Sequence, residues 1–318
     1  MVIVKAPFRV SLFGGSTDYK GFYEQYGSFM IGTTIDKYCY ISMRYRPEIL
    51  SKQYVCVYSK YELVDSINDF KNPLIRETLR YFNVDKPIEL FSFSDIPSRT
   101  GLGGSSAYCV AMSYLIKKLK EENINSKEII DAAITIEREI LKESGGIQDQ
   151  IWPFAKGFSS IGIKKDGTYN IKPLPITEEF EQALQDSMVL IYTEEQRNND
   201  IIAKSHEDDI NNKYQILETA KRAYKLFEYE DLEGIGKLVY ESWLSKERIS
   251  PYISNGKIKV IIDDVINMGA YGAKLLGSGG CGFVLAICNP LVKKNIIEKY
   301  KESILDFKID KTGVTTIY

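Results

Sequence analysis

The chain has 318 residues, of which 44% are hydrophobic and 26% charged, and this length suits one large globular domain or two moderate ones. Its formal net charge of −2 gives no overall basic field, which argues against nucleic acid as the main partner. Five scattered cysteines without a Cys-x-x-Cys pair favour a reducing cytoplasm over a disulfide framework or a zinc site, and no apolar run reaches the ~20 residues of a membrane span.

The first predicted element is a strand over residues 2–13. Phe8, Val10 and Leu12 share one side of the alternation, which predicts a strand with one buried face, and Arg9 projects from the other side. A turn of short polar residues follows at 14–19, and a second strand-like segment runs from 31 to 44. Further strands at 54–58 and 88–93 flank a helical stretch near 74–81.

Residues 97–107, Pro-Ser-Arg-Thr-Gly-Leu-Gly-Gly-Ser-Ser-Ala, form a segment rich in glycine and serine before a helical pattern over 106–120. Its three glycines permit positive φ and a close approach of the backbone to a ligand. Unpaired N–H groups at a helix start suit phosphate. A tight turn with serine caps is the alternative, and the segment matches neither a Walker A loop nor the dinucleotide-binding pattern.

A helix is predicted from Asn125 to about Lys142, because Asn125 and Glu128 have the spacing of a capping box. Glu137 falls on the apolar stripe of this helix, which comprises Ile130, Ala133, Ile134, Ile140 and Leu141. A carboxylate that faces the interior must be protonated, paired or bound to a cation. A buried salt bridge is the alternative to a metal site.

A glycine turn at 144–153 presents Asp149 in an otherwise apolar setting, where a helix cap is the alternative to a catalytic role. Prolines and acidic residues concentrate at 170–187, so we place the domain junction there and predict domains at 1–180 and 181–318. Strands at 188–192, 283–287 and 314–318 and helices over 201–247 and 257–268 follow. This order predicts an α+β fold.

Three stretches together resemble the GHMP family of small-molecule kinases. The matching segments are Ala6 through Gly14, Pro97 through Ala107, and Lys274 through Gly282, in the order that the family has them. Within the family, Gly14 to Asp18, Thr34 to Tyr38 and Gly146 to Gln150 look most like the D-glycero-D-manno-heptose 7-phosphate kinases. Two residues depart from this pattern, Cys281 in the third motif and Glu194 after the strand at 188–192.

The resemblance implies a role for each group. The loop that would bind the phosphates of ATP comprises Gly101, Leu102, Gly103, Gly104, Ser105 and Ser106. Ser106 and Glu137 would hold Mg²⁺, a cation that prefers oxygen ligands. Asp149 would be the base or the orienting acceptor for the sugar hydroxyl, and Arg9 would stabilise charge during transfer.

The same resemblance implies that Asp18 hydrogen-bonds sugar hydroxyls. Other residues that it places at the substrate are Thr17, Gly146 and Gly279. A sugar that already carries a phosphate needs a second basic site. Arg197 and Lys37 are the candidates, and either one can equally be an ordinary surface charge. The contacts to adenine are expected from residues 54–95.

The resemblance further implies a ribosomal S5 domain 2-like N-terminal domain and a ferredoxin-like C-terminal domain. We predict an ATP-dependent kinase that phosphorylates the anomeric hydroxyl of a heptose 7-phosphate, for nucleotide-activated heptose and surface glycan. A free-sugar 1-kinase of the galactose or fucose type and a catalytically silent sugar sensor are the alternatives. We expect no nucleic acid or membrane partner, and a homodimer is left open.

Overall fold

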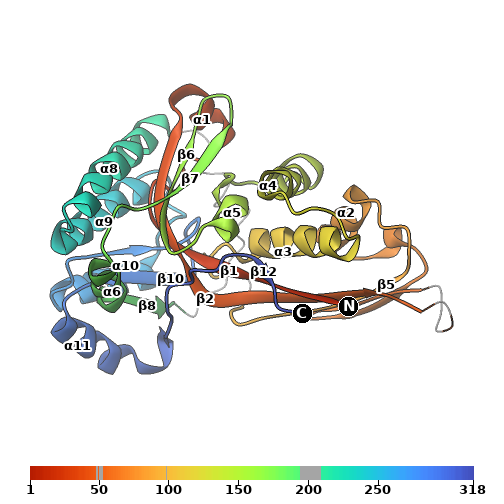
Figure 1. Ribbon diagram of the computed structural model, residues 1–318. Coiled ribbons are helices and arrows are strands. Elements are labelled where there is room, and N and C mark those ends of the chain that lie inside the picture. Colours follow the sequence, from red (N-terminus) through yellow and green to blue (C-terminus); the bar gives the residue numbers. More distant parts are fainter. Residues whose placement is uncertain (48, 50–52, 98, 194–208) are drawn as a thin grey trace.

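The computed structural model describes residues 1–47, 49, 53–97, 99–193 and 209–318, which form two sheets with helices around them (Figure 1). An eight-stranded sheet has the order β12-β1-β2-β5-β3-β4, with β6 and β7 joined through β2. Its strands are β1 (Val2–Phe13), β2 (Ser28–Tyr45), β3 (Tyr54–Val57), β4 (Tyr61–Val64), β5 (Ile88–Ser94), β6 (Phe158–Ile163), β7 (Tyr169–Pro173) and β12 (Thr315–Thr316).

The helices of this first half are α1 (Lys20–Tyr26), α2 (Pro73–Tyr81), α3 (Gly104–Leu119), α4 (Ser126–Ile134) and α5 (Gln148–Ile151). Each of the strands and helices predicted between residues 2 and 120 is confirmed in place. The expectation of one buried face for β1 is wrong, because helices cover both faces. Phe8 lies against the start of α3, whereas Phe13 packs edge-on against Phe227 of α8 (Ile210–Glu228).

The predicted helix from Asn125 begins as expected, since the Asn125 side chain accepts hydrogen bonds from the backbone of Lys127 and Glu128. After α4, however, the backbone widens into a π-helical turn over Thr135–Ile140, and Leu141 N–H donates to Ile136 O at 2.9 Å. This turn keeps Glu137 fully buried but leaves Ile140 42% exposed. The prediction that Ile140 belongs to the buried stripe is therefore wrong.

The second sheet has the antiparallel order β11-β8-β10-β9. Its strands are β8 (Met188–Tyr192), β9 (Gly272–Leu275), β10 (Phe283–Ile287) and β11 (Ile304–Leu305), and its helices are α8, α9 (Leu232–Glu247), α10 (Gly256–Asn267) and α11 (Pro290–Tyr300). Chain order and sheet order together give the ferredoxin-like arrangement. The α+β prediction is confirmed.

The two halves share one apolar core, in which Leu238 and Leu276 join residues of the first sheet. Helix α6 (Glu178–Ser187) spans the predicted boundary between residues 180 and 181, and the last strand, β12, returns to pair with β1. Ile3 N–H donates to Tyr318 O, so these residues lie side by side (Figure 1). The division at 180 stays a prediction. Within the described ranges, no helix is both long and apolar enough to cross a membrane.

Candidate active site

A cavity of about 1030 Å³ opens between the two halves. Its walls come from β1, the start of α3, the segment 143–149, the end of α9 and the loop after β9. It also extends between β3, α2 and β5, along Tyr58, Leu74 and Phe93. Part of the segment 54–95 therefore lines the same cavity as the glycine-rich loop, and the assignment of adenine to this part stays a prediction.

The glycine-rich loop leads directly into α3, which begins at Gly104. Gly101 and Gly103 have φ values of 78° and 76°, a conformation that favours glycine, and no side chain caps the first turn of α3. The loop after β9 packs directly against the glycine-rich loop, since a Cβ atom on Gly277 would lie 2.4 Å from the Gly101 Cα. All six residues from Gly101 to Ser106 line the cavity, so open N–H donors and the positive end of the helix dipole face it.

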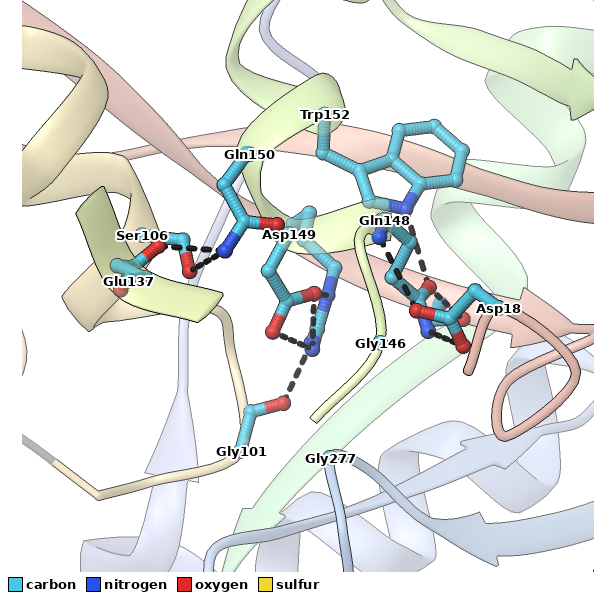
Figure 2. Close-up of polar contacts among 12 residues, drawn as sticks. Asp18, Gly101, Ser106, Glu137, Gly146, Gln148, Asp149, Gln150, Trp152 and Gly277 are labelled. Carbon is cyan, nitrogen blue, oxygen red and sulfur yellow. Dashed lines mark hydrogen bonds and ion pairs between the residues drawn. The ribbon is translucent and has the colours of Figure 1, made fainter. Parts of the chain in front are cut away.

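Arg9 and Asp149 form an ion pair beside this loop, and Figure 2 shows Asp149 between Gly101 and Gln148. The Arg9 guanidinium donates to both Asp149 carboxylate oxygens, from Nε at 2.8 Å and from Nη2 at 3.0 Å, and its Nη1 donates to Gly101 O at 2.6 Å. Arg9 is 5% exposed, whereas the Asp149 side chain is 27% exposed. The carboxylate is thus fixed in position and still open to a substrate.

Glu137 and Ser106 lie side by side around Gln150, whose Nε2 donates to Ser106 Oγ at 3.1 Å and to the Glu137 carboxylate (Figure 2). Burial raises the pKa of Glu137. Glu137 Oε1 and Gln150 Oε1 are buried without a hydrogen-bond partner. These orphaned atoms and the Ser106 hydroxyl are hard oxygen donors that fit Mg²⁺, which binds proteins through one or two carboxylates plus phosphate oxygens. Among the described residues, no three His, Cys, Asp or Glu side chains cluster as a metal site.

Asp18 is 2% exposed and holds the segment that carries Asp149. It accepts hydrogen bonds from the Gln148 backbone N–H at 3.0 Å and from Gln148 Nε2 at 3.1 Å, and burial raises its pKa. Gly146 passes so close that a Cβ atom there would lie 1.9 Å from Asp18 Oδ2. Gln148 Oε1 in turn accepts from Trp152 Nε1 (Figure 2) and from Ser11 Oγ. Sequence reasoning noted Gln148 within a motif but gave it no role.

Other residues predicted at the substrate are placed differently. Thr17 is fully buried and bonds Gly14 O and Ser28, outside the cavity lining. Lys37 pairs with Asp36 and does not line the cavity. The φ of Gly279 is 121° and a Cβ atom there would lie 2.8 Å from the Ile253 Cα, while Gly277 and Ser278, which precede it, line the cavity. Arg197 and Glu194 lie outside the described residues.

Two lysines of the second half also line the cavity, and sequence reasoning assigned neither a role. Lys246, near the end of α9, is 6% exposed and donates to Gly277 O. Lys274, in β9, is 4% exposed and donates to Leu12 O at 2.9 Å. Their positions follow from the approach of α9 and β9 to β1, which no spacing along the chain reveals.

Two family models match the chain. The model described as GHMP kinases N terminal domain covers residues 70–157, and the model described as GHMP kinases C terminal covers residues 223–304.

The chain is 27% identical to D-glycero-alpha-D-manno-heptose 7-phosphate kinase of Campylobacter jejuni over 328 positions, which cover 98% of this chain and 97% of that protein. It is 22% identical to a galactokinase of Thermotoga maritima, with 99% and 96% covered. The solved structure of a D-glycero-D-manno-heptose 1-phosphate kinase from Bacteroides thetaiotaomicron has the same fold, with a TM-score of 0.83, 20% identity and coverage of 100% and 99%.

Proposed function

The chain belongs to the GHMP kinase family, and from that premise we propose that it phosphorylates the anomeric hydroxyl of D-glycero-D-manno-heptose 7-phosphate to give the 1,7-bisphosphate. It is a sugar kinase, a phosphotransferase with an alcohol group as acceptor and ATP as the phosphate donor. The likeness to the Campylobacter jejuni protein over nearly the full length of both chains supports the heptose phosphate as acceptor. In the proposal, the product serves the synthesis of a nucleotide-activated heptose.

The single observation that carries this proposal is the Arg9–Asp149 pair at the end of the glycine-rich loop. A kinase must hold an acceptor hydroxyl in line with the terminal phosphate of ATP, and most of its catalysis comes from positioning and electrostatics. Arg9 of β1 holds Asp149 and also donates to Gly101 O of the loop, while Asp18 fixes the neighbouring residue Gln148. A carboxylate so fixed suits a group that orients a hydroxyl.

We assign the chemical roles as follows. Asp149 accepts the proton of the sugar hydroxyl while the oxygen of that hydroxyl forms a bond to the γ-phosphorus of ATP. The bond between the γ-phosphorus and the oxygen that bridges it to the β-phosphorus breaks, and ADP is released. Arg9 keeps Asp149 in place and offsets negative charge during transfer. Ser106 and Glu137 hold Mg²⁺, which neutralises charge on the phosphate oxygens when it is bound. The backbone N–H groups of 101–106 bind the phosphates of ATP.

The test is ADP release from Mg-ATP over a panel of sugars with and without a terminal phosphate. We expect turnover of D-glycero-D-manno-heptose 7-phosphate and weak turnover of the unphosphorylated heptose. If no sugar is turned over, the proposed substrate class is wrong.

A free-sugar 1-kinase is the second candidate, because galactokinases are relatives over 97–99% of this chain. The same panel separates the two candidates. Turnover confined to unphosphorylated hexoses would favour the galactose or fucose type and exclude the heptose assignment.

A further inference from the structure

The second half of the chain places two buried lysine side chains at the cavity. Lys246 and Lys274 are both buried, both line the cavity and each donates to a backbone carbonyl. Within the described residues, neither pairs with a carboxylate. A carbonyl offsets only part of the cost of burying an ammonium group, so such a group usually has an anionic partner.

The carboxylates nearest to Lys246 are already engaged. The charges of Arg9, Asp18 and Asp149 act on Lys246. The charges of Lys246 and Arg9 act on Lys274. Asp149 pairs with Arg9 through both oxygens, and both oxygens of Asp18 accept from Gln148. Arg9, Lys246 and Lys274 thus face only Asp18 and Asp149, which leaves positive charge in excess, and burial lowers the pKa of both lysines, that of Lys246 to about 8. A phosphate monoester, with a charge of about −2 at neutral pH, would offset this excess.

We propose that Lys246 and Lys274 form an anion subsite that binds the phosphate monoester of the acceptor sugar. This inference rests on the proposed sugar kinase function and names the residues that recognise its phosphorylated substrate. Each ammonium group has three N–H donors, and the carbonyl bond of each lysine uses one of them. The remaining donors suit phosphate oxygens, for which lysine acts as a point charge.

The acceptor is a better source of this phosphate than ATP is. The phosphates of ATP already have the 101–106 loop, the N-terminus of α3 and the Ser106–Glu137 pair. The two lysines instead reach the cavity from α9 and β9, and Lys246 lies in the electrostatic environment of Asp18 and Asp149 on the acceptor side. Lys37, a basic residue expected for this role, is paired with Asp36 away from the cavity.

The test compares KM values for heptose 7-phosphate and for the unphosphorylated heptose in Lys246→Met and Lys274→Met. We expect KM for the phosphorylated sugar to rise about 10- to 100-fold in each variant, since a charge-assisted hydrogen bond is lost. KM for ATP and for the unphosphorylated sugar should change less than about threefold. Lys246→Arg, which keeps the charge, should restore part of the affinity.

Lys237→Met is the matched control, because Lys237 lies on the same helix but is 67% exposed and pairs with Glu233. It should leave all KM values unchanged. Calorimetric titration of heptose 7-phosphate without nucleotide supplies a readout independent of turnover, and melting curves check that each variant folds.

Two results would overturn the subsite. One is an unchanged KM and Kd for heptose 7-phosphate in both methionine variants. The other is an equal loss of kcat with phosphorylated and unphosphorylated sugars, which would place the lysines at the transferred phosphate. Failure of the proposed function looks different, because the wild-type protein would then turn over no sugar phosphate at all.

Discussion

The two sides of the cavity are built by different means. On the proposed nucleotide side, the backbone would provide the binding groups: two glycines with positive φ, an uncapped helix start, and a second glycine loop packed against the first. On the proposed acceptor side, charged and polar side chains from separate elements would do so, and all but the partly exposed Asp149 are buried: Asp18 after β1, Gln148 and Asp149 in α5, Lys246 in α9 and Lys274 in β9.

Because of this difference, the two sides should tolerate different kinds of substitution. A backbone site accepts changes of side chain but not an added Cβ, because the space is already filled by another backbone. At a site made of charged side chains, even a substitution that keeps the shape of the side chain should impair binding or catalysis if it removes the charge. Substitutions on the two sides should therefore fail in different ways, and three of them test this.

The largest effect is expected on the acceptor side, at Asp149. Asp149→Asn keeps the shape but removes the proton acceptor, so kcat should fall about 10²- to 10⁴-fold. Affinity for ATP, measured by calorimetry, should stay the same because the loop 101–106 is untouched. Asp166→Asn, in an exposed turn, is the control. An unchanged kcat would remove Asp149 from the mechanism.

The second effect concerns stability, at Lys246. Its pKa is lowered from 10.5 to about 8 by burial, so the native state binds protons less readily than the unfolded chain does. Below pH 8 the buried Lys246 ammonium destabilises the native state by its full amount. The contribution of Lys246 to the free energy of unfolding rises between pH 8 and 10.5, and above pH 10.5 the cost is absent.

Lys246→Met should therefore be more stable than wild type at pH 7, by up to about 3 kcal/mol less the cost of the unsatisfied Gly277 carbonyl. The advantage should shrink between pH 8 and 10.5, as measured by urea unfolding. A stability difference between Lys246→Met and wild type that stays constant over this range would show that Lys246 carries no uncompensated charge.

The smallest effect is expected on the nucleotide side, at Gly277. Gly277→Ala adds a Cβ within 2.4 Å of the Gly101 Cα at a φ of 73°, so the glycine-rich loop must move. We expect about tenfold weaker ATP binding with little change in KM for the sugar. Gly256→Ala is the control, since nothing lies within 4 Å of its Cβ position. Equal ATP affinity in both variants would contradict a backbone-built site.

The same difference explains what the sequence could predict. The predicted strands and helices and the glycine-rich loop follow from local patterns, whereas α1, β4, β6, β7 and α6 were not predicted. The burial of Glu137 was predicted from helical spacing, but the exposure of Ile140 was not, because a π-helical turn changes the spacing. Burial of both faces of β1 depends on α3 and α8, which are distant in sequence.

Among the residues that line the cavity, the sequence motifs pointed to Asp18 and Asp149, but not to Lys246, which only the fold brings there. Lys246 looks like a surface lysine near a helix end, and only the approach of α9 to the loop at Gly277 buries it. Lys37 and Thr17 were expected at the substrate, yet Lys37 pairs with Asp36 and Thr17 supports a turn. The chemistry of a residue type was predictable, whereas its distance from the cavity was not.

The central claim is transfer of phosphate from ATP to the anomeric hydroxyl of a sugar that already carries a distal phosphate. Phosphorus NMR of the product formed from D-glycero-D-manno-heptose 7-phosphate and Mg-ATP tests it most directly. We predict a second phosphate signal coupled to the anomeric proton, beside the unchanged signal of the 7-phosphate. A new phosphate on any other carbon, or no product with this sugar, would contradict the account.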